Sequence, residues 1–530
     1  MKLRIVGAGI GALLLTSGMA LSQHDHGGHG AVGKVAFANS CIPAVQDEFT
    51  RGVAMLHSFW FSAGEQTFRD VLAKDPSCAI ATWGIAAILM LNPLNGVGPT
   101  PREAERAQAA IELGRRTGAR TQRERDYIDA VAAYYQDWAN RPETARQLAR
   151  AKAFETLAAR YPDDDEAQIF GALYLVGTQS QADQTYAAYL KAAAVLEGQF
   201  AKTPDHPGVS HYLIHAYDAP PIAAQGLAAA RRYAGLAPAA PHALHMPSHI
   251  FTRVGAWADS AATNRRAYDA AIANNELPEA YHASDYAVYA YLQLARDAAA
   301  QAAMADALKL TINAPAPPAV RYAAAAMPAR MAVERGDWRA AMQLVPPQGG
   351  FAYTDAIIWF ARALGAARTG DVAAAEQSAA ELAIRHKALV DAGNAYWARE
   401  VEVQQRTIAG WIAFARNRPD DALKLMREAA DLEDRNEKHI VTPGRILPAR
   451  ELLGDMLLEA GRPALALNEY EASQQREPHR FRGYYGAARA AEAAGDRDKA
   501  ALYYGKLLDL AKDADGQRPE VARARTFVAR

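Results

Sequence analysis

The sequence has 530 residues, is half hydrophobic and carries a net charge of -1. A nearly neutral chain gives no electrostatic reason to expect a nucleic-acid partner. Its abundant alanine and its scarcity of β-branched clusters predict an all-helical protein, built as several domains or as one long repeat array.

Residues 1–22 are typical of an export signal peptide. Lys2 and Arg4 precede an apolar run broken by small residues, and Ala20 and Ser22 fit the small-residue rule for cleavage. An uncleaved membrane anchor is the alternative, although the run is short for a membrane span. With cleavage after Ser22, the mature protein is expected to be periplasmic or secreted and to contain no membrane span.

The next segment, residues 23–40, is expected to be a flexible tail that contains histidine. Its start reads QHDHGGHG and carries His24, His26 and His29 among glycines. Short histidine-rich tracts bind copper or zinc, and copper heads the affinity order of divalent ions for such nitrogen sites. A mobile tail without a role is the alternative interpretation.

The chain has two cysteines, Cys41 and Cys78, which each precede a predicted helix. Export permits a disulfide, and we expect one between them. Two separate buried thiols are the alternative. A lone pair of cysteines without nearby histidine in finger-like spacing is a poor zinc signature.

One spacing recurs along the chain: a small residue, another 12 positions later, a bulky residue four after that, and proline eight further on. It occurs with Gly52, Gly64, Phe68 and Pro76, and again with Gly454, Ala466, Tyr470 and Pro478. Small residues let two antiparallel helices approach, the bulky residue fills the space between them, and the proline lies beyond the second helix. The pattern resembles the tetratricopeptide repeat (TPR) family over most of residues 41–514.

This resemblance implies an all-α solenoid of TPR-type helical hairpins stacked into a superhelix. We expect an N-terminal array over 41–312, a C-terminal array over 321–514 and a C-terminal extension over 515–530. The predicted hairpins span 45–75, 79–117, 122–160, 165–203, 207–237, 241–272, 282–310, 322–345, 356–387, 403–434, 447–477 and 481–511.

Six of the 14 histidines lie within one stretch of the sequence, residues 206–251. His211 and His245 are 34 residues apart, and so are His215 and His249. This distance is one whole repeat, so the paired positions should lie side by side on neighbouring hairpins. His211 and His215 also share a helix face, because they are four residues apart.

Two further residues extend these stripes. His242, His245 and His249 are spaced i, i+3 and i+7 on one predicted helix, and Asp218 follows His215 by three residues. The imidazoles of two adjacent helices are therefore expected to point toward each other.

Pro247 interrupts the second of these helices, because proline in a helix interior removes a backbone hydrogen bond. Either the helix is kinked, or it starts near Met246 and His245 lies in the preceding turn. In both cases we expect the alignment of His249 with His215 to be less disturbed than the alignment of His245 with His211.

Histidines in repeat register predict a transition-metal site, with copper favoured and zinc as the alternative. Neutral imidazole is a common ligand of both metals, and a site needs three or four converging donors. The alternative is a scaffold whose polar groove contacts a peptide or a partner protein without metal. The TPR resemblance implies that the groove is the concave surface. The predicted metal ligands are His211, His215, His242, His245 and His249.

Four other residues are secondary candidates. His282 and His57 are possible accessory ligands, although a structural role near the end of its helix is favoured for His57. His439 lies in an insertion over 439–448 that could fold over the groove as a lid. Asp218 is the catalytic candidate, either as a base or as a residue that orients a ligand, if a metal with an open position activates water or dioxygen.

Whether the protein is an enzyme is left open, because the sequence contains no standard catalytic motif. A metal-independent hydrolase that uses histidine and aspartate is a third interpretation. The segments HYLIHAYD and HALHMPSHIF resemble an exported bacterial subgroup of TPR proteins. That resemblance implies the fold and the site but no particular reaction, and TPR proteins in general bind proteins or peptides.

Overall fold

The computed structural model describes residues 30–312 and 316–529. The predicted export signal over 1–22 and the histidines of the tail at His24, His26 and His29 lie outside the described residues. Within the described part, none of the helices combines the length and the apolar character needed to cross a bilayer.

Every regular element of the described residues is a helix, and the helices form successive antiparallel pairs. Before the gap, the chain forms η1 (Pro43–Val45), α1 (Gln46–His57) with α2 (Phe61–Lys74), α3 (Ile80–Ile88) with α4 (Pro101–Thr117), α5 (Gln122–Tyr135) with α6 (Glu143–Arg160), α7 (Asp165–Val176) with α8 (Ala187–Lys202), α9 (Pro207–Ala216) with η2 (Ala223–Gly226) and α10 (Leu227–Leu236), α11 (Pro241–His245) and α12 (Pro247–Arg253) with α13 (Trp257–Ala273), and α14 (Leu277–Gln293) with α15 (Asp297–Leu308).

The pairs continue after the gap. They are α16 (Pro318–Val333) with α17 (Trp338–Met342), α18 (Ala352–Thr369) with α19 (Val372–Asp391), α20 (Ala395–Ala415) with α21 (Pro419–Glu433), α22 (Ala449–Glu459) with α23 (Pro463–Arg476), and α24 (Phe481–Ala493) with α25 (Arg497–Leu510), followed by α26 (Pro519–Val528). The predicted all-α fold of TPR-like helical hairpins is confirmed.

The recurring small and bulky residues pack as the spacing predicts. A Cβ added to Gly52 would lie 3.0 Å from the ring of Phe68, and one added to Gly84 would lie 2.5 Å from the same ring. At the other end of the chain, a Cβ added to Gly454 would lie 2.8 Å from the ring of Tyr470. The absence of a side chain at these glycines therefore allows neighbouring helices to close around one aromatic ring.

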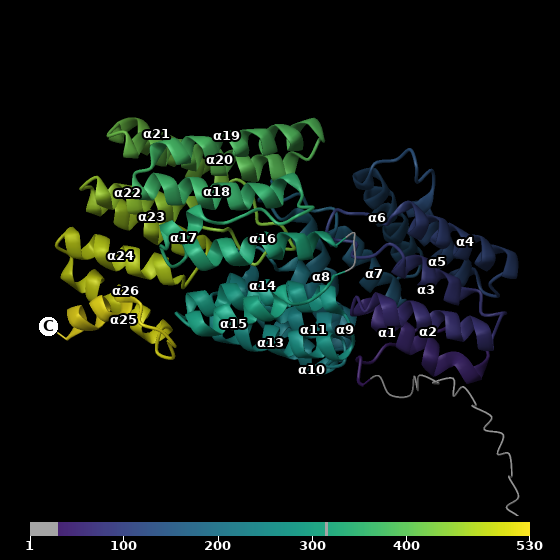
Figure 1. The fold of residues 1–530 in the computed structure, drawn as a ribbon. Coiled ribbons are helices and arrows are strands. Elements are labelled where there is room, and N and C mark those ends of the chain that lie inside the picture. Colours follow the sequence, from purple (N-terminus) through teal and green to yellow (C-terminus); the bar gives the residue numbers. More distant parts are fainter. Residues whose placement is uncertain (1–29, 313–315, 530) are drawn as a thin grey trace, which may run out of the picture.

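The hairpins wind into a superhelix that brings distant helices together (Figure 1). The purple N-terminal helices lie at one end, the teal helices α9–α15 in the middle and the yellow C-terminal helices at the other end. Helix α14 contacts α24. Beside this contact, the buried Arg480 side chain pairs with Glu334 at 2.8 Å and with Glu451 at 2.7 Å. Parts of both arrays thus meet in the middle of the molecule.

The segment before the first hairpin is more ordered than the predicted tail over 23–40. Val32 and Phe37 are buried, and the ring of Phe37 stacks on Trp83 with 5.1 Å between ring centroids. The prediction of a flexible tail is therefore wrong from about residue 32 onward, because these apolar side chains fit into the hydrophobic core. The extension over 515–530 also contains a helix, α26, which packs on α25.

A disulfide joins Cys41 and Cys78, as the sequence predicts, with their Cα atoms 4.7 Å apart. It connects the segment before α1 to the segment before α3. Both cysteines are therefore accounted for, and neither is available as a metal ligand.

The predicted insertion forms a long connection between α21 and α22, which we call the strap, residues 434–448. Most of the strap is buried, including Lys438 and Thr442. It crosses to the N-terminal array, where the backbone N–H of Glu437 donates to the carbonyl oxygen of Gln181 at 2.9 Å. The strap therefore covers the region where the histidine-bearing helices meet.

Candidate metal centre

The histidine cluster is built on the first helices of three successive hairpins: α9, the pair α11 and α12, and α14. The second of these is interrupted at Met246, where α11 ends and α12 begins at Pro247. Met246 itself keeps helical dihedral angles, φ -53° and ψ -37°. The chain therefore continues in nearly the same direction past the proline, and His245 and His249 stay on one side.

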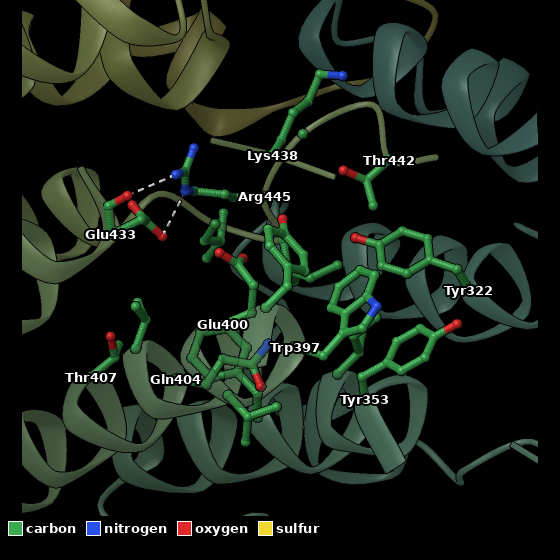
Figure 2. A pocket seen from close by; sticks show the side chains of 18 residues that line it. Tyr322, Tyr353, Trp397, Glu400, Gln404, Thr407, Glu433, Lys438, Thr442 and Arg445 are labelled. Carbon is green, nitrogen blue, oxygen red and sulfur yellow. Dashed lines mark hydrogen bonds and ion pairs between the residues drawn. The ribbon is translucent and has the colours of Figure 1, made fainter. Parts of the chain in front are cut away.

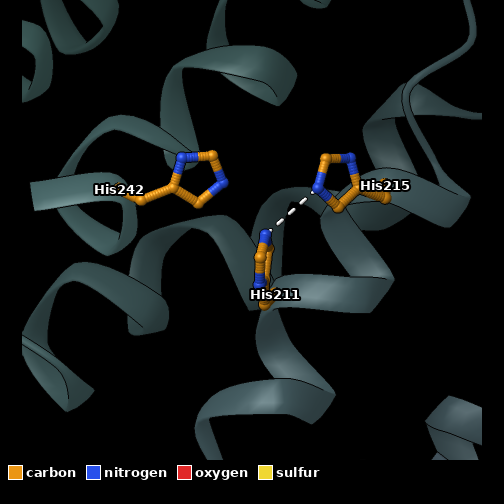
Figure 3. A group of neighbouring side chains, drawn as sticks. All are labelled: His211, His215 and His242. Atoms are coloured by element: carbon orange, nitrogen blue, oxygen red, sulfur yellow. Dashed lines mark hydrogen bonds between the residues drawn. The ribbon is translucent and has the colours of Figure 1, made fainter. Parts of the chain in front are cut away.

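Three imidazoles form the first triad, His211, His215 and His242 (Figure 3). One ring nitrogen of each lies within 4.8 Å of one ring nitrogen of both others. The Nε2 atoms of His211 and His215 are 3.1 Å apart. The Nε2 atom of His242 is buried and has no hydrogen-bond partner in the protein.

The second triad consists of His245, His249 and His282, whose ring nitrogens meet the same 4.8 Å limit. The Nε2 atoms of His245 and His249 are 3.2 Å apart. His282 comes from the second turn of α14, which begins five residues earlier than the predicted hairpin. Its Nδ1 atom is buried without a partner in the protein. The structure thus places the accessory candidate His282 beside the predicted ligands.

The two triads are adjacent. The rings of His215 and His249 lie 5.8 Å apart between centroids, in agreement with their 34-residue spacing. His211, by contrast, has the ring of His242 as its neighbour across the hairpins, at 5.2 Å. The expected pairing of His211 with His245 is therefore wrong: the neighbour of His211 is His242, which lies three residues before His245 on α11.

In four of the six histidines, the Nδ1 atom forms a hydrogen bond with an oxygen outside the cluster. The Nδ1 atom of His211 contacts the carbonyl oxygen of His57 at 2.6 Å, and that of His242 contacts a carboxylate oxygen of Glu279 at 3.1 Å. Carbonyl and carboxylate oxygens only accept, so each Nδ1 must carry the proton. The Nε2 atom of each ring is then left with a lone pair directed at the cluster.

The same arrangement holds in the second triad. The Nδ1 atom of His245 lies 2.7 Å from Oδ1 of Asn264, whose amide nitrogen donates to the carbonyl of Ser260 and so fixes the orientation of the amide. The Nδ1 atom of His249 lies 2.9 Å from a carboxylate oxygen of Asp218. Ring orientation by a second hydrogen bond is typical of histidines that bind metal.

Five of the six imidazoles, those of His211, His215, His245, His249 and His282, are held in the neutral form. None of the six residues is more than 8 % exposed. Burial lowers the pKa of His249 to about 4, although Asp218 opposes the change, and burial lowers the pKa of His282 to about 3. Burial, helped by neighbouring imidazoles, also holds the pKa of His211, His215 and His245 well below the ordinary value. Neutral imidazole is the form that binds a metal ion.

Asp218 does not have the surroundings of a catalytic base. Its carboxylate accepts hydrogen bonds from His249, from Arg253 at 2.8 Å and from Lys438 of the strap at 3.0 Å. Burial alone would raise the pKa of this carboxyl, but Lys438, Arg253 and His249 together hold the pKa well below its ordinary value. Of the two roles considered for Asp218, orientation of a ligand therefore fits the structure, and proton abstraction does not.

His57 lies in a separate buried group with Glu166 and His206. Its Nε2 atom contacts Glu166 at 2.8 Å and its Nδ1 atom contacts the hydroxyl of Tyr212 at 2.8 Å. Both ring nitrogens are therefore engaged, and the ring is not a ligand of the main cluster. Its contribution is the backbone carbonyl that holds His211.

The strap closes over the second triad. The hydroxyl of Tyr286 on α14 lies 3.3 Å from Nε2 of His249 and donates to the carbonyl oxygen of Thr442 at 3.0 Å. His439 does not join the cluster; its ring packs against Trp397 and Tyr396, at 5.2 Å from each. The strap therefore covers the cluster through the backbone of Thr442, within the predicted insertion, and through Lys438, which precedes it; His439 takes no part.

A pocket lies beside the strap, between it and helices α16, α18 and α20 (Figure 2). Aromatic rings form one wall, with Tyr353 and Trp397 stacked at 4.1 Å. Arg445 and Glu433 form an ion pair at 3.2 Å, and burial raises the pKa of Glu433 to about 8 despite this pair. Thr442 and Lys438 belong to the lining, so the strap borders both this pocket and the histidine cluster.

Several residues of the site were not among the sequence candidates. Glu279 and Tyr286 share a helix face with His282, at spacings of three and four residues. Glu279 also follows His245 by 34 residues, so the repeat register could have identified it. Lys438 had no such signal, because it lies 220 residues from Asp218 in the sequence.

No family model matches the sequence, and no curated protein does. Among solved structures, a chain of the APC/C hetero-tetramer Cut9–Hcn1 is 11% identical with a TM-score of 0.32, over 91% of this chain and 95% of that chain. Human IFIT1 in its dimer with PPP-AAAA is 12% identical with a TM-score of 0.34, over 82% of this chain and 90% of that chain. The IFIT1 dimer with m7Gppp-AAAA gives 12% and 0.36, over 81% and 90%. These likenesses concern the helical fold alone.

Proposed function

We propose that this protein is an exported TPR-like protein that binds a transition metal, copper in preference to zinc, through its buried histidine cluster. Export rests on the features of residues 1–22, which suit a signal peptide for the periplasm or secretion. The preference for copper rests on an all-nitrogen donor set and on the order of divalent affinities for such sites. The histidines of the tail, which could pass copper to the protein, support the same metal.

The facing Nε2 atoms of His245 and His249 carry this proposal. Each ring has its proton on Nδ1, held by Asn264 or Asp218, so each Nε2 atom has only a lone pair. The two Nε2 atoms are nevertheless 3.2 Å apart. No hydrogen bond can form between two neutral rings in this arrangement. Two nitrogen ligands at about 2.0–2.1 Å from one ion stand roughly 3–3.4 Å apart, so a bound cation accounts for the distance.

A metal at this place could also support chemistry. An ion with an open position activates water or dioxygen. Besides Asp218, His249 has one hydrogen-bonding partner among the described residues that is not an imidazole, the hydroxyl of Tyr286. Since Asp218 is held as a carboxylate by two cations, its part in any reaction would be to keep His249 oriented and neutral.

The alternative function is a metal-free scaffold for a peptide or partner protein. The pocket beside the strap favours this alternative, because stacked aromatic rings and an ion pair suit a peptide side chain. The histidines do not suit the polar groove expected for this alternative, since a peptide on the surface would not reach residues that are at most 8 % exposed.

Metal analysis of the untagged protein tests the proposal. We expect the chain with alanine at His24, His26 and His29 to retain at least about one copper or zinc ion per chain. The His215→Ala/His249→Ala variant should lose most of this metal, because it removes one donor from each triad.

The matched control is His386→Ala, which removes a histidine on α19, far from the cluster in the sequence. Its metal content should equal that of the parent chain. Negligible metal in the parent chain, together with added copper that binds no better than to the double variant, would leave the scaffold as the better account.

A further inference from the structure

The cluster offers more imidazole donors than one ion uses. Zinc and copper take three or four protein ligands in sites of this kind. The described residues bring six histidines together, and their ring nitrogens separate into two groups of three. Each group on its own satisfies the need of one ion for three protein donors with a position left open.

The first triad is prepared for an ion independently of the second. His211 and His242 have their own oxygen partners, the carbonyl of His57 and the carboxylate of Glu279. The Nε2 atom of His242 is buried with no partner, which normally costs free energy unless a ligand satisfies it. Without an ion, Nε2–H of His215 donates to Nε2 of His211 at 3.1 Å, and this distance also suits two nitrogen ligands of one ion.

The second triad has its own supports, Asn264 for His245 and Asp218 for His249. Its third member, His282, lies with its ring centroid 4.5 Å from that of His245. The unpartnered Nδ1 of His282 is again a buried polar atom that the protein leaves unsatisfied.

The triads touch each other at two places. Ring centroids are 5.8 Å apart between His215 and His249 and 5.9 Å apart between His242 and His245. Because rings of the two triads are direct neighbours, ions held by them would lie close together, and in two-metal sites such neighbouring ions share a small bridging ligand.

We propose that the cluster is a dinuclear site, which holds one transition-metal ion in each histidine triad with a small oxygen ligand such as hydroxide between them. This inference rests on the proposed metal binding and adds the number of ions and their ligands. His282 becomes a full ligand of the second ion instead of an accessory one. The strap and Tyr286 then close the second ion's side of the site.

Copper counting and electron paramagnetic resonance of the full chain with alanine at His24, His26 and His29 test the inference. After loading with Cu²⁺ and gel filtration, we expect two copper ions per chain. Adjacent Cu²⁺ ions couple magnetically, so the integrated signal should correspond to far fewer than two spins per chain.

Two variants separate the triads, His211→Ala/His242→Ala and His245→Ala/His282→Ala. Each should retain one copper ion per chain and show a full single-spin signal, because the remaining ion has lost its neighbour. Circular dichroism shows whether each variant is folded. If a variant is unfolded, the copper count and the spin count of the parent chain decide between one ion and two.

The possible outcomes distinguish the two proposals. One copper ion per chain with a full single spin in the parent would overturn the dinuclear site and leave the proposed function standing. Two ions with two uncoupled spins would also overturn it, since the ions would not be neighbours. No copper in the parent would overturn the proposed function itself.

Discussion

Replacing Asp218 with asparagine is expected to cost roughly 3–5 kcal/mol of the free energy of unfolding, the usual cost of breaking a buried ion pair. The carboxylate is buried and faces two cations, Arg253 at 2.8 Å and Lys438 at 3.0 Å. Asparagine keeps the shape of the side chain but removes the charge that compensates both. Lys438, whose pKa burial already lowers to about 8, would also lose the neighbour that raises its pKa most.

The same substitution should weaken metal binding by about 10–100-fold, because Asp218 is the partner that orients His249. Urea unfolding gives the change in stability and competition with a chelator gives the change in affinity. The control is Asp205→Asn, which breaks exposed ion pairs with Arg232 and Lys34 and should change stability by less than about 1 kcal/mol. An Asp218→Asn variant as stable as this control would contradict the role of the buried carboxylate.

Removing the bound metal with a chelator is expected to lower the midpoint of thermal unfolding by several degrees. A ligand that binds only the folded state, at a free concentration about 1,000 times its dissociation constant, adds roughly 4 kcal/mol of stability. Without the ion, the lone pairs of His245 and His249 face each other at 3.2 Å in a buried site. Calorimetry or circular dichroism with and without chelator measures the difference.

The control for this prediction is the His245→Ala/His249→Ala variant, which should show a smaller change on chelation because only the first triad is left to hold an ion. Comparing each protein with itself removes the effect that the substitutions have on packing. An unchanged midpoint in the parent protein would show that the cluster does not hold a metal that contributes to stability.

Repeat spacing made much of the fold readable from the sequence. The recurring glycines and aromatics, such as Gly52 with Phe68, predicted the helical hairpins, because close helix packing needs a small residue opposite a large one. The same period predicted that His215 and His249 lie next to each other. It did not predict which residue faces His211, since His242 and His245 lie three residues apart on the same short helix α11, and the spacing alone does not decide between them.

The surroundings of the histidines were less predictable, because most of them depend on contacts across the superhelix. Lys438 reaches Asp218 only because the strap crosses from the C-terminal hairpins to α9. The carbonyl of His57 lies 154 residues from the ring that it holds. Such contacts follow from the curvature of the whole array, which local spacing does not encode. Val32 and Phe37 were missed for a simpler reason, since a few apolar residues in a glycine-containing tail give little sign of burial.

Anomalous diffraction at the copper absorption edge, from crystals of the copper-loaded protein, tests the central claim most directly. The account predicts a peak about 2.0–2.1 Å from the Nε2 atoms of His245 and His249, with a second peak in the triad of His211, His215 and His242. Copper found only at other places on the protein, with an empty histidine cluster, would contradict the claim that these imidazoles form a metal centre.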